Sequence, residues 1–289
     1  MQKTGWLIYN KEMAQINSGF ISWFMSEAIL LNIKLQLVIK EDLHYGITSD
    51  QLSMLHNGKA VSMPDFAIMR NNDPLLTKQL NGLGIKVFNN SLVSQISNHK
   101  GRTHQFLAGK GIPMLDTVFV SREEFCSDFD LLPFPYPVVI KEVAGRGGNQ
   151  VYKAECHKEL ADILECVQAK ELIIQRMGDV IGRDVRVFVI GGDIIAAILR
   201  SSDQDFRANF SLGGTAQLYE LNEAQRSLVK KVIAAFNGEL DFVGIDFLFA
   251  KDGSFIFNEI EDVAGSRTLS ANSDVFIVRL YLEHILRSV

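Results

Sequence analysis

A lysine and three glycines follow an apolar strand that we expect over Val138–Ile140. The segment reads Lys141-Glu-Val-Ala-Gly145-Arg-Gly147-Gly148. Glycines let backbone N–H groups approach an anion closely, and a lysine at the end of a strand supplies a fixed positive charge. This spacing is typical of a loop that covers phosphate groups, and a hairpin turn with a solvated lysine is the alternative. The segment is no Walker A loop, because no Gly-Lys-Ser/Thr follows.

Three acidic side chains are expected on one face of a hairpin. The hairpin is predicted from two apolar segments and the Asp-Gly turn between them, namely Val243–Phe249, Asp252-Gly253 and Phe255–Ile260. Counting outwards from a two-residue turn places Asp246 opposite Glu259, and Glu261 shares their face. Buried carboxylates this close repel unless a cation lies between them. Oxygen ligands favour magnesium or manganese, and the alternative is that the carboxylates are solvated or matched by Lys and Arg.

A third group of polar residues lies between these two motifs. Arg200, Arg207 and Asn209 could bind an anion, because the planar guanidinium recognises phosphate and carboxylate. An ordinary polar loop with surface arginines is the alternative. Asp184 directly precedes the apolar strand Val185–Ile190 and is either a ligand-binding residue or a strand-end residue with a local salt bridge.

The elements that must position these residues begin with an alternation of strands and helices. We expect strands at Trp6–Tyr9, Lys34–Ile39, Asp65–Met69 and Ile85–Phe88, and a helix at Phe20–Asn32. This alternation predicts a parallel sheet with helical crossovers. No Gly-x-Gly-x-x-Gly follows the first strand, so a dinucleotide-binding domain is unsupported. Arg70-Asn-Asn-Asp73 ends one strand at the edge where open sheets of this kind bind ligands, and Arg267 lies beside the metal strand.

The pattern changes to a mixed one after about residue 95. We expect one helix over Ser91–Gly111, strands at Val138–Ile140, Leu172–Gln175, Val185–Ile190 and Asp193–Leu199, and helices at Leu221–Phe236 and Phe276–Leu286. The predicted fold class is therefore α/β in the first region and α+β in the second.

Composition excludes several classes of protein. The 289 residues include 47% hydrophobic and 22% charged residues, enough apolar surface to exclude disorder as the main state. Lys plus Arg is 29 and Asp plus Glu is 34, so the net charge of −5 gives no footprint for nucleic acid. The three cysteines, Cys126, Cys156 and Cys166, form no disulfide framework. No membrane span or signal-peptide core is found, so we expect a cytoplasmic protein.

The order of these motifs resembles the ATP-grasp superfamily over about residues 95–289. Within it, the chain is most similar to the RimK-like ribosomal-protein glutamate ligases. That similarity is carried by Gly182-Arg-Asp-Val-Arg186, Phe206-Arg-Ala-Asn209 and Gly244-Ile-Asp246. The resemblance implies an ATP-grasp fold with an α/β pre-ATP-grasp domain at 1–95, a central lobe at 96–175 and a C-terminal lobe at 176–289.

The resemblance also assigns roles to matching positions, with ATP and magnesium, or manganese, as cofactors. The nucleotide-binding positions are Lys100 and Lys141 at the phosphates, Gly145, Gly147 and Gly148 in the covering loop, Gln175, Arg176 and Met177 at the adenine, and Asp184 at the ribose. The positions facing the transferred phosphoryl group are Arg200, Arg207 and Asn209. The metal ligands are Asp246, Glu259 and Glu261.

The function implied is ATP-dependent joining of a carboxylate to an amine through an acyl phosphate. A phosphotransferase acting on a hydroxyl and a non-catalytic nucleotide-binding protein are the alternatives. The expected partners are a small carboxylate and a small amine, or a peptide tail, with no nucleic acid or membrane, and a homo-oligomer is left open. Three departures leave the acceptor open: Glu261 where the family has Asn, Ala264-Gly265 where it has Pro-Gly, and Gln175 where an acidic residue is common.

Overall fold

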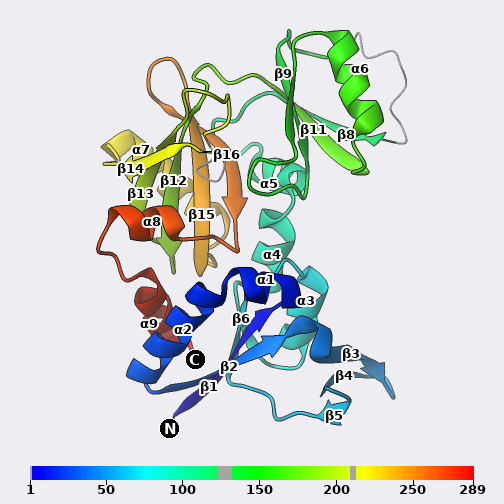
Figure 1. The fold of residues 1–289 in the computed structure, drawn as a ribbon, viewed down its shortest axis with the longest axis vertical. Coiled ribbons are helices and arrows are strands. Elements are labelled where there is room, and N and C mark those ends of the chain that lie inside the picture. Colours follow the sequence, from blue (N-terminus) through cyan, green and yellow to red (C-terminus); the bar gives the residue numbers. More distant parts are fainter. Residues whose placement is uncertain (1, 123–131, 209–212) are drawn as a thin grey trace.

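The computed structural model describes residues 2–122, 132–208 and 213–289. They form three groups of elements (Figure 1), which we call the N-terminal unit (β1 to β7), the central lobe (β8 to β11 with α6) and the C-terminal lobe (β12 to α9). The N-terminal unit lies at the bottom of the view, below the sheets of both lobes, with α9 beside α2. Within the described residues, every helix is too short or too polar to cross a membrane.

The N-terminal unit contains the parallel sheet that the sequence predicts. Its strands are β1 (Lys3–Tyr9), β2 (Ile33–Ile39), β6 (Phe66–Met69) and β7 (Lys86–Phe88), in the order β2-β1-β6-β7. Its helices are α1 (Lys11–Ile16), α2 (Ser18–Leu30) and α3 (Pro74–Gly82). The sequence analysis missed a 3-10 turn and a small antiparallel sheet, η1 (Lys40–Asp42), β3 (Leu43–Thr48), β4 (Gln51–His56) and β5 (Lys59–Ala60).

Two helices stand where one was predicted over Ser91–Gly111. They are α4 (Ser91–Ser97) and α5 (Lys100–Leu107). The prediction is wrong because His99 is extended, with φ −139° and ψ 100°, and its Nδ1 accepts a hydrogen bond from the Arg102 N–H at 3.2 Å. A side chain that caps a helix in this way competes with continuation of the previous one. The break places Lys100 at the start of a helix, with its N–H bonded to the Val143 carbonyl at 2.9 Å.

The central lobe is an antiparallel sheet covered by one helix. Its elements are β8 (Thr117–Ser121), β9 (Val138–Glu142), β10 (Val151–Ala154), α6 (His157–Cys166) and β11 (Glu171–Arg176), in the sheet order β10-β9-β11-β8. Buried residues of the sheet, such as Val138 and Ile174, pack with Leu160 and Leu164 of α6 in a core that belongs to this lobe alone.

The C-terminal lobe is a five-stranded antiparallel sheet with apolar residues on both faces. Its elements are β12 (Arg183–Ile190), β13 (Asp193–Ser201), β14 (Thr215–Leu218), α7 (Glu223–Ala235), β15 (Phe242–Phe249), β16 (Phe255–Glu261), α8 (Arg267–Asn272) and α9 (Ile277–Ser288). Val187 of β12 packs in the core that includes α7, whereas Phe188 packs with α9 and the N-terminal unit. The alternation of side chains along this strand therefore joins the lobe to two different partners.

Candidate active site

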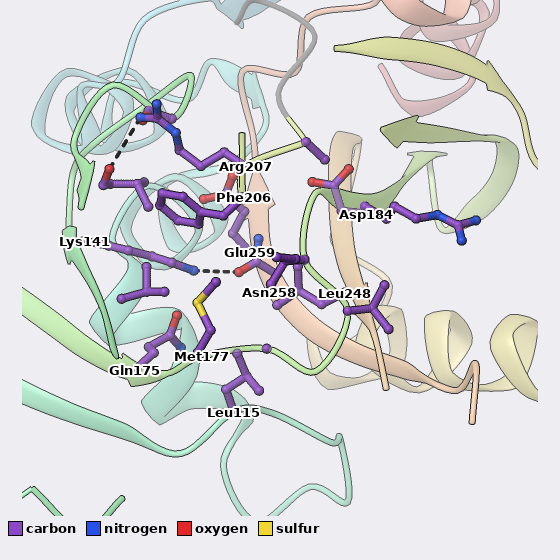
Figure 2. Close-up of a pocket in the computed structure, with 18 of the residues that line it drawn as sticks. Leu115, Lys141, Gln175, Met177, Asp184, Phe206, Arg207, Leu248, Asn258 and Glu259 are labelled. Carbon is purple, nitrogen blue, oxygen red and sulfur yellow. Dashed lines mark hydrogen bonds between the residues drawn. The ribbon is translucent and has the colours of Figure 1, made fainter. Parts of the chain in front are cut away.

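Most of the predicted site residues line one cavity between the central and C-terminal lobes (Figure 2). The predicted residues that line it are Lys100, Lys141, Gly145, Gly147, Gly148, Gln175, Arg176, Met177, Asp184, Arg200, Arg207 and Glu259. Asp246 and Glu261 are bonded to residues around the cavity without lining it, and Asn209 lies outside the described residues.

The hairpin that carries the acidic residues pairs Asp246 with Glu259 as predicted, but its turn is longer than predicted and its second strand contains a bulge. Its tip is a three-residue loop, because the Ala250 N–H bonds to the Ser254 carbonyl at 2.9 Å, and strand pairing at the tip is shifted by one residue. A bulge after Phe257 reverses that shift and returns Asp246 to its predicted position opposite Glu259. Because a bulge sets two residues against one, Asn258 and Glu259 both reach the cavity.

Asp246 is held by two arginines. Both of its oxygens accept from Arg186, at 2.7 Å each, and Oδ2 also accepts from Arg200 at 2.7 Å, with the side chain only 1% exposed. Burial opposes the charge, but the two guanidinium groups more than offset it and hold the pKa of Asp246 well below its usual range. Arg186 also pairs with Glu261, with Nη1 and Oε2 at 2.7 Å.

Each of the three predicted metal ligands has a cationic partner: Arg186 and Arg200 at Asp246, Arg186 at Glu261, and Lys100 at Glu259. Within the described ranges, no group of three or more His, Cys, Asp or Glu side chains is arranged to hold a metal ion. The sequence analysis missed the role of Arg186. Its partner is fixed by the pairing of β12 with β15, which places Arg186 directly opposite Asp246 and which no local pattern reveals.

Asp184 forms an ion pair across the sheet rather than with a sequence neighbour. β12 and β13 pair Asp184 with Arg200, whose Nε and Nη2 donate to the two carboxylate oxygens at 2.6 and 2.7 Å. Arg200 is 4% exposed and also contacts Asp246, so it links two buried carboxylates at the wall of the cavity. Such a bidentate pair fixes the orientation of both side chains.

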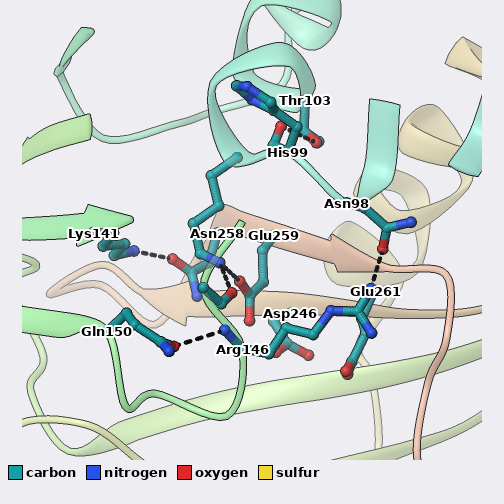
Figure 3. Close-up of polar contacts among 12 residues, drawn as sticks. Asn98, His99, Thr103, Lys141, Arg146, Gln150, Asp246, Asn258, Glu259 and Glu261 are labelled. Carbon is teal, nitrogen blue, oxygen red and sulfur yellow. Dashed lines mark hydrogen bonds and ion pairs between the residues drawn. The ribbon is translucent and has the colours of Figure 1, made fainter. Parts of the chain in front are cut away.

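Two lysines contact the hairpin, and Figure 3 shows Lys141 beside Asn258. Lys100 Nζ lies 3.1 Å from Glu259 Oε2, and Lys141 Nζ donates to Asn258 Oδ1 at 2.8 Å. Burial lowers the pKa of Lys141 to about 8, although the charge of Glu259 opposes the shift. The sequence analysis also missed Asn258, because its place in the site depends on the bulge.

Side chains of α5 and of the C-terminal lobe donate hydrogen bonds to carbonyl groups of the glycine loop. Lys100 Nζ donates to the Gly145 carbonyl, and Arg207 Nη1 donates to the Gly148 carbonyl at 2.7 Å. Gly147 and Gly148 have φ of 64° and 79°, a conformation that favours glycine. The loop does connect the antiparallel hairpin of β9 and β10, but Lys141 is buried rather than solvated, and Arg207 of the C-terminal lobe contacts the loop.

The sequence also indicated Arg70 to Asp73 and Arg267 as residues that could bind a second ligand. The structure places these residues in different surroundings. Arg70 is 7% exposed, and its Nη2 donates to the Ala264 carbonyl at 2.9 Å, so it ties the N-terminal unit to the C-terminal lobe. Asp73 accepts from the Leu76 N–H at 2.9 Å at the start of α3. Arg267 is exposed at the start of α8.

Known proteins resemble this chain in sequence and in fold. A family model described as a RimK-like ATP-grasp domain matches residues 97–285. Human N-acetylaspartylglutamate synthase A is 31% identical over 79% of this chain, which spans 61% of that protein. A probable alpha-L-glutamate ligase of Xanthomonas euvesicatoria is 28% identical over 84% of this chain and 85% of its own length. The D-alanine–D-alanine ligase of Bacillus anthracis, solved with ATP, superposes with a TM-score of 0.74 over 99% of this chain and 96% of that one, at 17% identity.

Proposed function

The chain belongs to the RimK-like ATP-grasp family, and from that premise we propose that it is an ATP-dependent ligase that joins a carboxylate to an amine. The observation that carries this proposal is the convergence of Lys100, Lys141 and Arg207 on one cavity, beside the carboxylate of Glu259. Cations placed in this way neutralise charge on a phosphoryl group as it moves, and such positioning needs no protein nucleophile.

The proposed reaction has two steps, formation of an acyl phosphate and formation of the amide. A carboxylate oxygen of the acid substrate attacks the γ-phosphorus of ATP, the bond to the β-phosphate oxygen breaks, and ADP leaves. The amine nitrogen then attacks the carbonyl carbon of the acyl phosphate, phosphate leaves with the former carboxylate oxygen, and the nitrogen loses a proton. Lys100, Lys141 and Arg207 would hold the phosphates, and a closed glycine loop would exclude water from the acyl phosphate. Asn209 would face the transferred group, as the family resemblance implies.

The nucleoside would lie on the β11 side of the cavity. Gln175, Arg176 and Met177 would contact the adenine, and Asp184 would contact the ribose. This assignment is supported by the position of all four residues in the cavity wall. Asp184 keeps free lone pairs beside its bonds to Arg200, so it could also accept from ribose hydroxyls.

A divalent cation fits the acidic hairpin in donor chemistry. Glu259 and Glu261 are 28% and 25% exposed and supply the oxygen ligands that magnesium prefers. We propose that these two glutamates and Asp246 hold magnesium, or manganese, once their carboxylates turn from their lysine and arginine partners toward the ion. Arg186 would balance the additional charge of Glu261. When bound, the ion would neutralise negative charge on the phosphate groups of ATP.

The names of the relatives suggest glutamate as the amine substrate. To test the proposal, the purified protein is incubated with ATP, magnesium, glutamate and pools of amino acids, N-acetylated amino acids and short peptides. We expect ADP together with a product whose mass is the sum of acid and amine less one water. ADP with a phosphorylated hydroxyl would instead indicate a phosphotransferase. ATP binding without ADP formation for any acceptor would indicate a non-catalytic protein.

A further inference from the structure

The side-chain amide of Gln175 is held on its nitrogen side only. Gln175 lies on β11 between Val139 of β9 and Thr117 of β8, and its side chain is among those that line the cavity (Figure 2). The residue is 1% exposed. Its Nε2 donates to His104 Nε2 at 3.1 Å and to Thr117 Oγ1 at 2.9 Å. Both amide hydrogens are therefore used within the protein.

His104 can only accept from this amide. Its Nδ1 lies 2.8 Å from the Lys100 carbonyl oxygen, and a carbonyl has no hydrogen to give, so Nδ1 is the donor. Burial lowers the pKa of His104 to about 4, although the bond to the Lys100 carbonyl opposes the shift, and the ring is neutral at pH 7. A neutral imidazole with a hydrogen on Nδ1 carries a lone pair on Nε2.

Thr117 can only accept as well. Its hydroxyl hydrogen is donated to the Leu115 carbonyl at 2.8 Å, which leaves the lone pairs of Oγ1 for Gln175. Turning the Gln175 amide over would bring its oxygen against two acceptors. The orientation of the Gln175 amide is therefore fixed by the hydrogen bonds that His104 and Thr117 donate to backbone carbonyl groups.

The opposite end of the amide has no such partner. Gln175 Oε1 is shielded from solvent and accepts no hydrogen bond from any residue that the structure describes. A buried polar atom in this state is unfavourable unless a ligand supplies a donor. The N6 amino group of adenine is such a donor, whereas the 6-oxo group of guanine or hypoxanthine is a second acceptor.

We propose that His104 and Thr117 are positioning residues that lock the Gln175 amide with its oxygen toward the cavity, and that this lock selects a 6-amino purine over a 6-oxo purine. The inference rests on the proposed binding of a purine nucleotide beside β11. It deepens that proposal by naming the two side chains that decide the specificity for the base.

The first test needs no variant. Dissociation constants are measured by calorimetry for ATP, inosine triphosphate and purine riboside triphosphate, which have an amino group, an oxo group and hydrogen at position 6. We expect ATP to bind at least about tenfold more tightly than either analogue, since one well-made hydrogen bond contributes on that order. Equal affinities of ATP and inosine triphosphate would overturn the lock. Failure to bind any of the three would instead overturn the proposed function.

The second test asks whether Thr117 and His104, rather than the rest of the cavity wall, decide the specificity for the base. Thr117→Val removes the acceptor at nearly constant volume, and Thr117→Ser keeps it as the matched control. We expect the ratio of inosine to adenosine triphosphate dissociation constants to fall several-fold in Thr117→Val and to stay at the wild-type value in Thr117→Ser. It should fall further in the Thr117→Val, His104→Phe double variant, where the amide is free to turn. A ratio that stays at the wild-type value in Thr117→Val, with wild-type thermal stability, would refute the role of Thr117.

Discussion

At the scale of single residues, Asp246 contributes both to the stability of the site, through its ion pairs, and to the proposed chemistry, as a metal ligand. From the sequence alone, replacing Asp246 and Glu259 together with amides is expected to abolish magnesium-dependent turnover and leave the fold intact. The contacts with Arg186 and Arg200 change the second half of that expectation, because a neutral amide would leave two buried guanidinium groups without their shared anion.

We therefore predict that Asp246→Asn lowers the free energy of unfolding by about 3–5 kcal/mol, the usual effect of removing one partner from a buried ion pair. Glu261→Gln is the matched control, since Glu261 is 25% exposed and, among the residues that the structure describes, forms its ion pair with Arg186 alone. We expect that change to lower stability by no more than about 1 kcal/mol. Urea unfolding measures both values, and equal losses in the two variants would contradict the central place given to Asp246.

Lys141 gives a prediction about pH. Its ammonium group loses its proton around pH 8 in the free protein, so its attraction for phosphate is complete below that pH and declines above it. Bound phosphates would raise this pKa again, so ATP binding at pH 8 should take up protons. Calorimetry in two buffers of different ionisation enthalpy measures the uptake. In Lys141→Arg the charge persists at all accessible pH values, and the uptake should disappear. Equal uptake in the variant would mean that another group titrates.

At the scale of elements, the turn before β12 sets the position of the segment that contains Phe206 and Arg207. Gly182 has φ of 67°, its N–H bonds to the Phe206 carbonyl at 2.9 Å, and its carbonyl accepts from the Ser202 N–H at 2.8 Å. A Cβ at this position would lie 2.4 Å from the Ser202 carbonyl oxygen. The glycine thus permits the approach that brings Phe206 and Arg207 to the cavity.

We predict that Gly182→Ala lowers stability by about 1–3 kcal/mol and reduces turnover more than it weakens ATP binding. Gly213→Ala is the control, because Gly213 also has a positive φ, 91°, but no atom of the described residues beyond its chain neighbours would lie within 4 Å of a Cβ there. The control should show the backbone strain without the displacement of Arg207. Thermal unfolding and steady-state kinetics of the two variants distinguish them, and identical behaviour would contradict a positioning role for the turn.

Local patterns predicted ten strands and the helices α2, α7 and α9, because the periodicity of apolar residues reports burial directly. The short strands β3, β4, β5, β8, β10 and β14 were missed, since few residues leave no clear alternation. Local patterns predicted one helix across His99, where a side-chain cap overrides a continuous pattern. They also placed Asp246 opposite Glu259 from a turn of the wrong length, and only the bulge at Asn258 makes the pair correct. The ion pairs of Arg186 and Arg200 depend on which strands are neighbours, which no segment of the sequence reveals alone.

At the scale of the whole molecule, the N-terminal unit and the C-terminal lobe share a core. Phe24 and Phe66 pack in the same buried cluster as Phe188 and Tyr281, whereas the central lobe has its own core. The boundaries at residues 95 and 175 remain predictions. The shared core indicates that the first of them does not separate independently folding parts.

We predict that residues 96–289 without the N-terminal unit will lose cooperative unfolding, because removal of that unit exposes the apolar side of α9 and its sheet. Calorimetry and sedimentation of the truncated chain test this. The full chain is the control, and its C-terminal lobe and N-terminal unit should unfold in one transition. A truncated chain that is monomeric and unfolds cooperatively at the same temperature would contradict the shared core.

The central claim is that a carboxylate oxygen attacks the γ-phosphorus of ATP in the cavity between the lobes. The most direct measurement follows that oxygen, by labelling the carboxylate of the acid substrate with ¹⁸O and analysing the phosphate released during turnover with the amine. An acyl phosphate predicts one labelled oxygen in inorganic phosphate for each amide formed. Unlabelled phosphate, or label in AMP, would contradict it.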